Sequence, residues 1–180
     1  EVPRYFHRHQ YFLPHTFGFK FMSDKPYISI LMYHQVGNFE NITRLKANYC
    51  HVDRFRKQMH FLRRWGYHVI SLTDAIKGLK GEIDLPKHSV VITFDDGYEN
   101  FYDHAYPILK ELELPSTVYA VAGMVGRPSD WLYEDDIEPA PLMTLEQMLE
   151  VQMHGVDFGS HAIDHPRLSK LSQTEMNRQV

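Results

Sequence analysis

The sequence predicts an α/β protein in which parallel strands alternate with helices. Short runs rich in Val, Ile, Phe and Tyr recur along the chain, and segments with apolar residues at helical spacing separate them. The run Val90–Phe94 is apolar at all but one position, which is typical of a strand that is buried on both faces. With 180 residues the chain can form one domain with a substantial core. We therefore expect βαβ units arranged as a sheet or barrel.

The composition narrows the classes of function. A net charge of −4 argues against a nucleic-acid-binding protein, because such proteins usually present a basic surface. No apolar run approaches the ~20 residues that a membrane-spanning helix needs, and the first residues lack the apolar core of a signal peptide. Cys50 is the single cysteine, so no internal disulfide is expected. The 12 histidines make a metal site worth testing.

The α/β pattern begins after an unusual N-terminal segment. Residues 1–26 are rich in aromatic and basic residues without a clear period, and we expect an arm that packs on the domain or on a partner. A buried strand over 28–33 is then expected to lead to His34. Apolar residues at helical spacing between Val52 and Leu62 predict a helix that ends before Gly66. The next expected elements are a strand over 67–70, a helix over 73–79 and the central strand over 90–94.

The second half of the chain continues the alternation. A helical stretch over 100–112 contains Pro107, which either kinks it or starts its second half. Thr144 and Gln147 form a capping box that predicts a helix ending near Gly155. The remaining expected elements are a strand over 117–122, a long loop over 123–143, a strand over 156–158 and a helix that starts at Ser172 and runs to Val180.

Two adjacent carboxylates, Asp95 and Asp96, follow the central strand. Asp is a poor strand former and like charges repel, so the simplest explanation is a solvated turn with a helix-capping Asp. Other chemically capable residues also follow strands, however: His34 follows the first, and His161 and His165 follow the last. Because the loops after the carboxyl ends of parallel strands carry the chemistry of such folds, we expect these three loops to converge.

The combination of residue types indicates a hydrolytic metal site. Two histidines and one carboxylate are a common ligand set for a catalytic divalent ion, which Zn, Ni, Co, Mn or Fe could supply. Taken alone, His161 and His165 are better explained as exposed loop histidines, since Pro166 disfavours a helix there. With one Asp on an ion, its neighbour is free to act as a base, and the cation offsets the repulsion between them. Hydrolysis of an amide or ester requires such a base.

The motifs around these residues resemble a known family. Thr93-Phe94-Asp95-Asp96-Gly97 and His161-Ala162-Ile163-Asp164-His165-Pro166 are similar to the first two motifs of the polysaccharide deacetylases, the family 4 carbohydrate esterases with the NodB-homology fold. Five further short segments are also similar to the family: Leu31-Met32-Tyr33-His34, Gly66-Tyr67, Pro107-Ile108-Leu109-Lys110, Phe158-Gly159-Ser160-His161 and Pro166-Arg167-Leu168. The resemblance covers residues 27–180 and is greatest for the circularly permuted deacetylases of exopolysaccharides such as poly-N-acetylglucosamine. It implies a distorted (β/α) barrel.

The resemblance also implies a role for each residue. Asp95 would be the general base, and Asp96, His161 and His165 would hold one divalent ion, with zinc the first candidate. In the permuted branch a histidine after an early strand replaces the family's late general acid, which makes His34 the candidate acid. The aromatic residues expected at the substrate are Tyr98, Trp131 and Tyr133.

The expected function is the removal of N-acetyl groups from a polysaccharide of the N-acetylglucosamine type, outside the cytoplasm: in the periplasm, at the cell surface or in the medium. Two alternatives stay open, an O-acetyl esterase acting on xylan or peptidoglycan and a non-catalytic glycan-binding module that retains the fold. A non-haem iron oxygenase would need a different fold from the βαβ pattern. The family's later motif, an Arg and an aromatic residue next to Pro, has no match after Pro166, so we expect a domain that is incomplete at its C-terminus.

Overall fold

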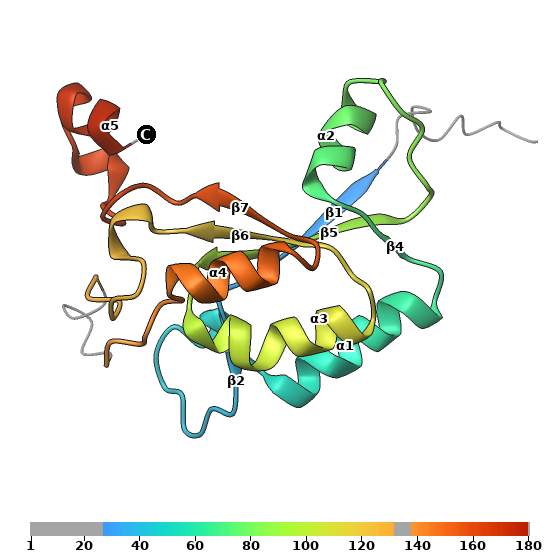
Figure 1. The fold of residues 1–180 in the computed structure, drawn as a ribbon, viewed down its shortest axis with the longest axis horizontal. Helices are drawn as coiled ribbons and strands as arrows, with labels where there is room; N and C mark the ends of the chain where they lie inside the picture. Colours follow the sequence, from blue (N-terminus) through green and yellow to red (C-terminus); the bar gives the residue numbers. More distant parts are fainter. Residues whose placement is uncertain (1–26, 132–137, 180) are drawn as a thin grey trace, which may run out of the picture.

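A parallel sheet organises the part of the chain that the computed structural model describes, residues 27–131 and 138–179 (Figure 1). The strands, in their spatial order, are β1 (Ile28–Tyr33), β5 (Ser89–Asp96), β6 (Ser116–Ala120) and β7 (Val156–Ser160). A short strand, β4 (His68–Val69), pairs with the first residues of β5, and β6 pairs with its last residues. Since β1 pairs with β5 along its whole length, β4 and β6 lie on the opposite side of β5. All of these pairs are parallel, as the alternation of strands and helices predicts.

Helices cover the sheet unevenly. Three of them pack beneath it in the view of Figure 1: α1 (Val52–Arg64), α3 (Tyr106–Glu111) and α4 (Leu145–Gln152). The other two lie on the opposite side and at opposite ends of it: α2 (Leu72–Leu79) and α5 (Gln173–Gln179). The α/β prediction is thus confirmed. Among the described residues the sheet is open, with β1 and β7 at its two edges.

The core lies between the sheet and the three helices that pack beneath it. Phe55 and Met59 of α1 are fully buried against Ile92 and Phe94 of β5. The ring of Phe94 meets that of Phe101 at a centroid distance of 4.6 Å and an interplanar angle of 65°. Seven of the eight residues of β5 are buried, which accounts for the largely apolar sequence of residues 90–94.

The structure adds detail that the sequence pattern does not show. Two short strands, β2 (Gln35–Gly37) and β3 (Tyr49–His51), form a second parallel pair that was not expected. The helical stretch after β5 is a π-helical turn over Phe101–Ala105 followed by α3. Pro107 lies in the first turn of α3, directly after the π-helical turn. None of the described helices is long and apolar enough to cross a membrane. The predicted N-terminal arm, residues 1–26, lies outside the described residues.

Candidate active site and metal centre

The register of the sheet brings the chemically capable residues to one edge. Asp96, the last residue of β5, pairs with Ala120 of β6, and Ala120 in turn pairs with Ser160 of β7. His161 follows directly, and its backbone N–H donates to the carbonyl of Ala120 at 2.8 Å. On the other side of β5, Tyr33 pairs with Phe94, so His34 follows β1 at the level of Asp95. The three loops therefore meet at the carboxyl edge of the sheet.

Asp96 and the two histidines point their ligand atoms at a common position. The Oδ1 atom of Asp96 lies 3.4 Å from Nε2 of His161 and 3.2 Å from Nε2 of His165, and the three atoms lie within 4.8 Å of one another. An ion with tetrahedral bonds of about 2.0–2.1 Å holds its ligand atoms about 3.3 Å apart. The Asp96 side chain is 4% exposed, and its Oδ1 has no hydrogen-bond partner within the described residues. A buried carboxylate oxygen without a donor, facing two imidazole nitrogens, fits a divalent cation.

The backbone at these ligands adopts conformations that most residues avoid. Asp96 has φ 73°, Ala162 has φ 66° and His165 has φ 52°, all in the left-handed region. Asp and His are among the residues that occupy this region most readily, whereas Ala gains no compensating contact from its side chain. Gly97 continues the left-handed turn at φ 79°, so the chain reverses sharply after β5. Such strain persists where the surrounding structure enforces it, which is common at functional sites.

The loop that carries both histidines is held by the backbone of a neighbouring turn. The N–H groups of Ala122 and Gly123 donate to the carbonyls of Ala162 and Ile163, both at 2.9 Å. A Cβ atom on Gly123 would lie 2.7 Å from the Ile163 carbonyl oxygen, so glycine is needed for this approach. This contact fixes the middle of the histidine loop against the end of β6.

Asp95 and His34 lie beside the three candidate ligands. Nε2 of His34 is 4.0 Å from Oδ2 of Asp95, and the two side chains are 18% and 16% exposed, so both can reach solvent and a substrate. Burial raises the pKa of Asp95, while the imidazoles of His34 and His161 oppose that rise. Because Asp96 turns into the left-handed region and Asp95 remains extended in the strand, neighbouring carboxylates face different partners.

Contacts on both sides anchor His34. Before it, the ring of Tyr33 stacks on Phe94 at 5.4 Å. After it, the side-chain amide of Asn100 donates to Oε1 of Gln35 at 2.9 Å and accepts from the backbone N–H of Val36 at 3.3 Å. Asn100 thereby ties the His34 loop to the segment that follows Asp96 and Gly97. No pattern in the sequence marks Asn100 or Gly123, because their partners are distant in the sequence.

The three aromatic residues expected at the substrate have different environments. Trp131 is half-buried and stacks on the His165 ring at a centroid distance of 4.5 Å, so it borders the candidate metal centre. Tyr98 is 2% exposed, which puts its ring beneath the site and not on its surface. Burial, reinforced by the nearby Asp96 carboxylate, raises the pKa of Tyr98 far above its usual range. Tyr133 lies outside the described residues.

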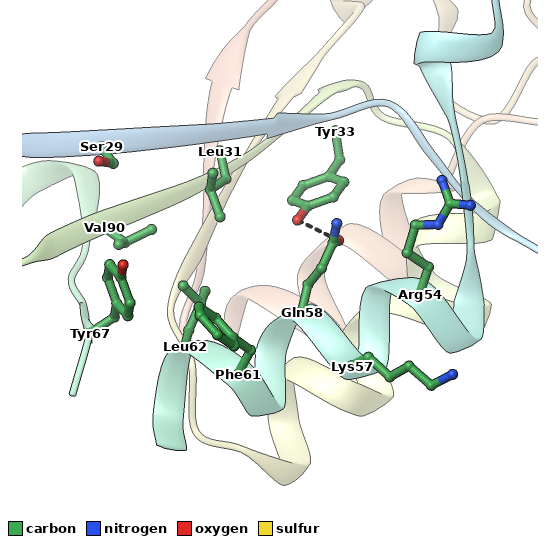
Figure 2. A pocket seen from close by; sticks show the side chains of 10 residues that line it. All are labelled: Ser29, Leu31, Tyr33, Arg54, Lys57, Gln58, Phe61, Leu62, Tyr67 and Val90. Carbon is green, nitrogen blue, oxygen red and sulfur yellow. Dashed lines mark hydrogen bonds between the residues drawn. The ribbon is translucent and has the colours of Figure 1, made fainter. Parts of the chain in front are cut away.

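Two cavities differ in their chemistry. One of about 340 Å³ opens beside His161 and His165 and extends to Gln179. A larger one of about 530 Å³ lies between β1 and α1, where the hydroxyl of Tyr33 donates to Gln58 at 3.0 Å (Figure 2). Among the residues that the structure describes, no carboxylate or histidine lines this larger cavity. Its size therefore does not make it the candidate active site, since hydrolysis requires the acid–base and ligand groups at the sheet edge.

Known proteins are similar to this chain in sequence. The sequence pattern of the family described as polysaccharide deacetylase matches residues 82–180. Over 125 residues the chain is 28% identical to the poly-β-1,6-N-acetyl-D-glucosamine N-deacetylase of Staphylococcus aureus, a match that covers 69% of this chain and 40% of that protein.

Solved structures of deacetylases are also similar. The Streptococcus pyogenes deacetylase PplD, determined in complex with acetate, matches with a TM-score of 0.68 and 29% identity over 84% of this chain and 63% of that chain. IcaB from Ammonifex degensii matches with a TM-score of 0.66 and 28% identity over 82% of this chain and 57% of that chain. The chain spans 11% to 48% of the length of three curated relatives that it matches.

Proposed function

Because this chain belongs to the polysaccharide deacetylase family, we propose that it removes N-acetyl groups from a polysaccharide of N-acetylglucosamine. One observation carries the proposal: the buried Oδ1 of Asp96 has no hydrogen-bond donor within the described part of the chain and faces Nε2 of both His161 and His165. This arrangement supports a bound divalent ion, with zinc the first candidate. A relative named as a poly-β-1,6-N-acetyl-D-glucosamine N-deacetylase supports the choice of substrate.

Asp96, His161 and His165 would hold the ion. When bound, a divalent ion polarises the acetyl carbonyl and stabilises the negative charge that develops on its oxygen. Three protein ligands leave coordination positions open for water and substrate, as in other catalytic sites. The cation would also stabilise the adjacent charges of Asp95 and Asp96, which otherwise repel each other.

Asp95 and His34 would perform the proton transfers. Asp95 takes a proton from the attacking water, and protonated His34 donates a proton to the amide nitrogen as the bond between carbonyl carbon and nitrogen breaks. The products are acetate and the free amine of the sugar. The carbon that is attacked and the nitrogen that is protonated are bonded to each other, so a base and an acid that lie 4.0 Å apart can serve both. Imidazole suits the acid role because it titrates near neutral pH.

The decisive experiment measures metal content and acetate release on one protein sample. Zinc-loaded protein is incubated with β-1,6-linked N-acetylglucosamine oligomers, and acetate is quantified beside the metal per chain. We expect about one ion per chain and acetate release that stops when a chelator removes the ion. An O-acetyl esterase would instead release acetate faster from acetylated xylan. A non-catalytic module would bind the oligomers and release none.

A further inference from the structure

The side chain of Gln179, at the end of α5, forms hydrogen bonds with the middle of the loop that carries the two histidines. Its Oε1 accepts hydrogen bonds from the backbone N–H groups of Ile163 at 3.0 Å and Asp164 at 3.1 Å. Its Nε2 donates to Oδ2 of Asp164 at 3.1 Å. A single side-chain amide thus makes three hydrogen bonds to two consecutive residues, both of which lie between His161 and His165.

This loop needs external support. It has no regular secondary structure, and two of its residues, Ala162 and His165, are in the left-handed region. On one side the N–H groups of Ala122 and Gly123 hold it. Gln179 holds the opposite side and also lines the cavity of about 340 Å³ that contains both histidines. Hydrogen bonds therefore hold the loop between His161 and His165 on two sides, from the end of β6 and from the end of α5.

We propose that Gln179 is a positioning residue for the metal centre. Its amide fixes the peptide between Ile163 and Asp164, which keeps the His161 and His165 rings directed at Asp96. The proposal rests on the metal site of the proposed function and adds a third element, α5, to the β5 and β7 loops that supply the ligands. Mutating a residue that orients the metal ligands without binding the metal commonly lowers metal affinity by about 10–100-fold.

An amide is the side chain that this position requires. The carbonyl oxygen accepts from two N–H groups while the NH₂ group donates to a carboxylate. Glutamate can accept from both N–H groups, but it lacks the donor and opposes the charge of Asp164. The chain also supplies a matched control on the same helix: Gln173 donates to Asn177 at 2.8 Å on the exposed surface, away from the histidine loop.

The test measures the zinc affinity of metal-free protein by competition with a chromophoric chelator. We expect Gln179→Ala to bind zinc about 10-fold or more weakly than the unchanged protein. Gln173→Ala should bind it equally well. The thermal unfolding midpoint of each metal-free variant shows whether the fold persists.

A rescue experiment separates positioning from a general loss of stability. Gln179→Glu should weaken zinc binding as Gln179→Ala does. Combining it with Asp164→Asn exchanges the amide and the carboxylate, so that all three hydrogen bonds can form again. Restored zinc affinity in this double variant supports the proposal, even if Gln179→Ala fails to fold.

Three results would overturn it. Zinc affinity that is unchanged in Gln179→Ala removes the positioning role while leaving the proposed metal site intact. An equal loss in Gln173→Ala shows a general effect of α5. If the double variant binds zinc no better than Gln179→Glu alone, the hydrogen bonds between residues 179 and 164 do not set the zinc affinity. If the unchanged protein itself binds no zinc, the proposed metal site fails, and this inference fails with it.

Discussion

Asp95 and Asp96 are neighbours in the sequence with different environments in the fold. The Asp96 side chain is 4% exposed and faces the two histidines, whereas that of Asp95 is 16% exposed and lies near His34. The left-handed backbone of Asp96, with φ 73°, separates the two directions. This difference supports the proposed roles, in which Asp96 would hold an ion and Asp95 would act on a water molecule. Three predictions at the scale of single residues follow from it.

Removing one candidate ligand should lower metal content. In His165→Ala only Asp96 and His161 remain, and we expect zinc per chain to fall well below one after dialysis, with affinity reduced by ~100-fold or more. Metal analysis after dialysis measures this directly. The exposed His154 serves as the control, because its replacement by Ala leaves the ligand set intact. Full zinc occupancy in His165→Ala would contradict the ligand assignment.

Replacing the candidate base should separate catalysis from metal binding. Asp95→Asn keeps the size of the side chain and removes its ability to accept a proton, so we expect zinc content to be retained and acetate release to fall by ~10²-fold or more. Asp103→Asn, at an exposed position after β5, is the matched control. Loss of zinc with activity retained in the remaining loaded protein would mean that the two aspartates have exchanged roles.

Loss of the candidate acid, His34, should lower activity most on substrates whose leaving group must be protonated. An amide nitrogen must be protonated as it leaves, whereas the phenolate of an activated acetyl ester departs without a proton. We therefore expect His34→Ala to lose ~10²-fold or more of its N-deacetylation and much less of its activity on 4-nitrophenyl acetate, with zinc retained. His60→Ala, on the exposed face of α1, should change neither rate. An equal loss on both substrates argues against the acid role.

At the scale of elements, the site depends on contacts between segments that are far apart in the sequence. Parallel register aligns the ends of β1, β5 and β7, and polar side chains then tie the following loops together. Asn100 links the segment after β5 to β2, and Gln35, its partner, is 5% exposed. Because buried polar groups without partners are costly, this link couples the stability of the fold to the position of His34.

Breaking this link should affect stability and activity together. Asn100→Ala leaves Oε1 of Gln35 and the N–H of Val36 without these partners, so we expect a loss of about 1–3 kcal/mol in the free energy of unfolding. Acetate release should fall by up to ~100-fold, since His34 loses its support. Urea unfolding and the acetate assay measure the two effects. Asn177→Ala, an exposed amide on α5, should change the stability by less than about 0.5 kcal/mol.

At the scale of the whole molecule, β5 is the common element of core and site. Its even-numbered residues Ile92 and Phe94 pack against α1 and the π-helical turn, and the same strand ends in Asp95 and Asp96. The hydrophobic burial of β5 stabilises the strand and so holds the two carboxylates at its end in place. The candidate metal centre therefore depends on the core that lies beneath the sheet.

Two phenylalanines of α1 test how much the core contributes. Phe55 is fully buried, and its ring contacts Tyr33 and Phe94, whereas Phe61 on the same helix is 49% exposed. We expect Phe55→Ala to lower the free energy of unfolding by about 3–5 kcal/mol. Phe61→Ala should cost clearly less, because much of its surface already contacts water. Similar losses in urea unfolding of the two variants would contradict this location of the core.

The sequence alone determined the five strands of the main sheet, in their order along the chain, and the polar residues at their ends. Hydrophobic runs and their length identify the strands over 28–33 and 90–94. The expected burial is confirmed for 90–94 but is wrong for 28–33, because β1 is an edge strand whose Ile30 and Met32 are each 60% exposed among the described residues. Parallel pairing then predicts that His34, the two aspartates and the two histidines meet at one edge. The expected ends were less accurate: β5 continues through Asp96, since its pairing with β6 outweighs the poor strand propensity of Asp.

Only the tertiary structure decided how the candidate site is held together. The left-handed backbone at Asp96 follows from no pattern in the sequence. The close approach of Gly123 and the hydrogen bonds of Asn100 and Gln179 join segments that are distant in the sequence. The pair β2 and β3 escaped prediction for the same reason, because strands of three residues gain their stability from neighbours and not from their own pattern. Periodicity reports which face of an element is buried. It carries no information about which partner buries it, and the geometry of a ligand set depends on those partners.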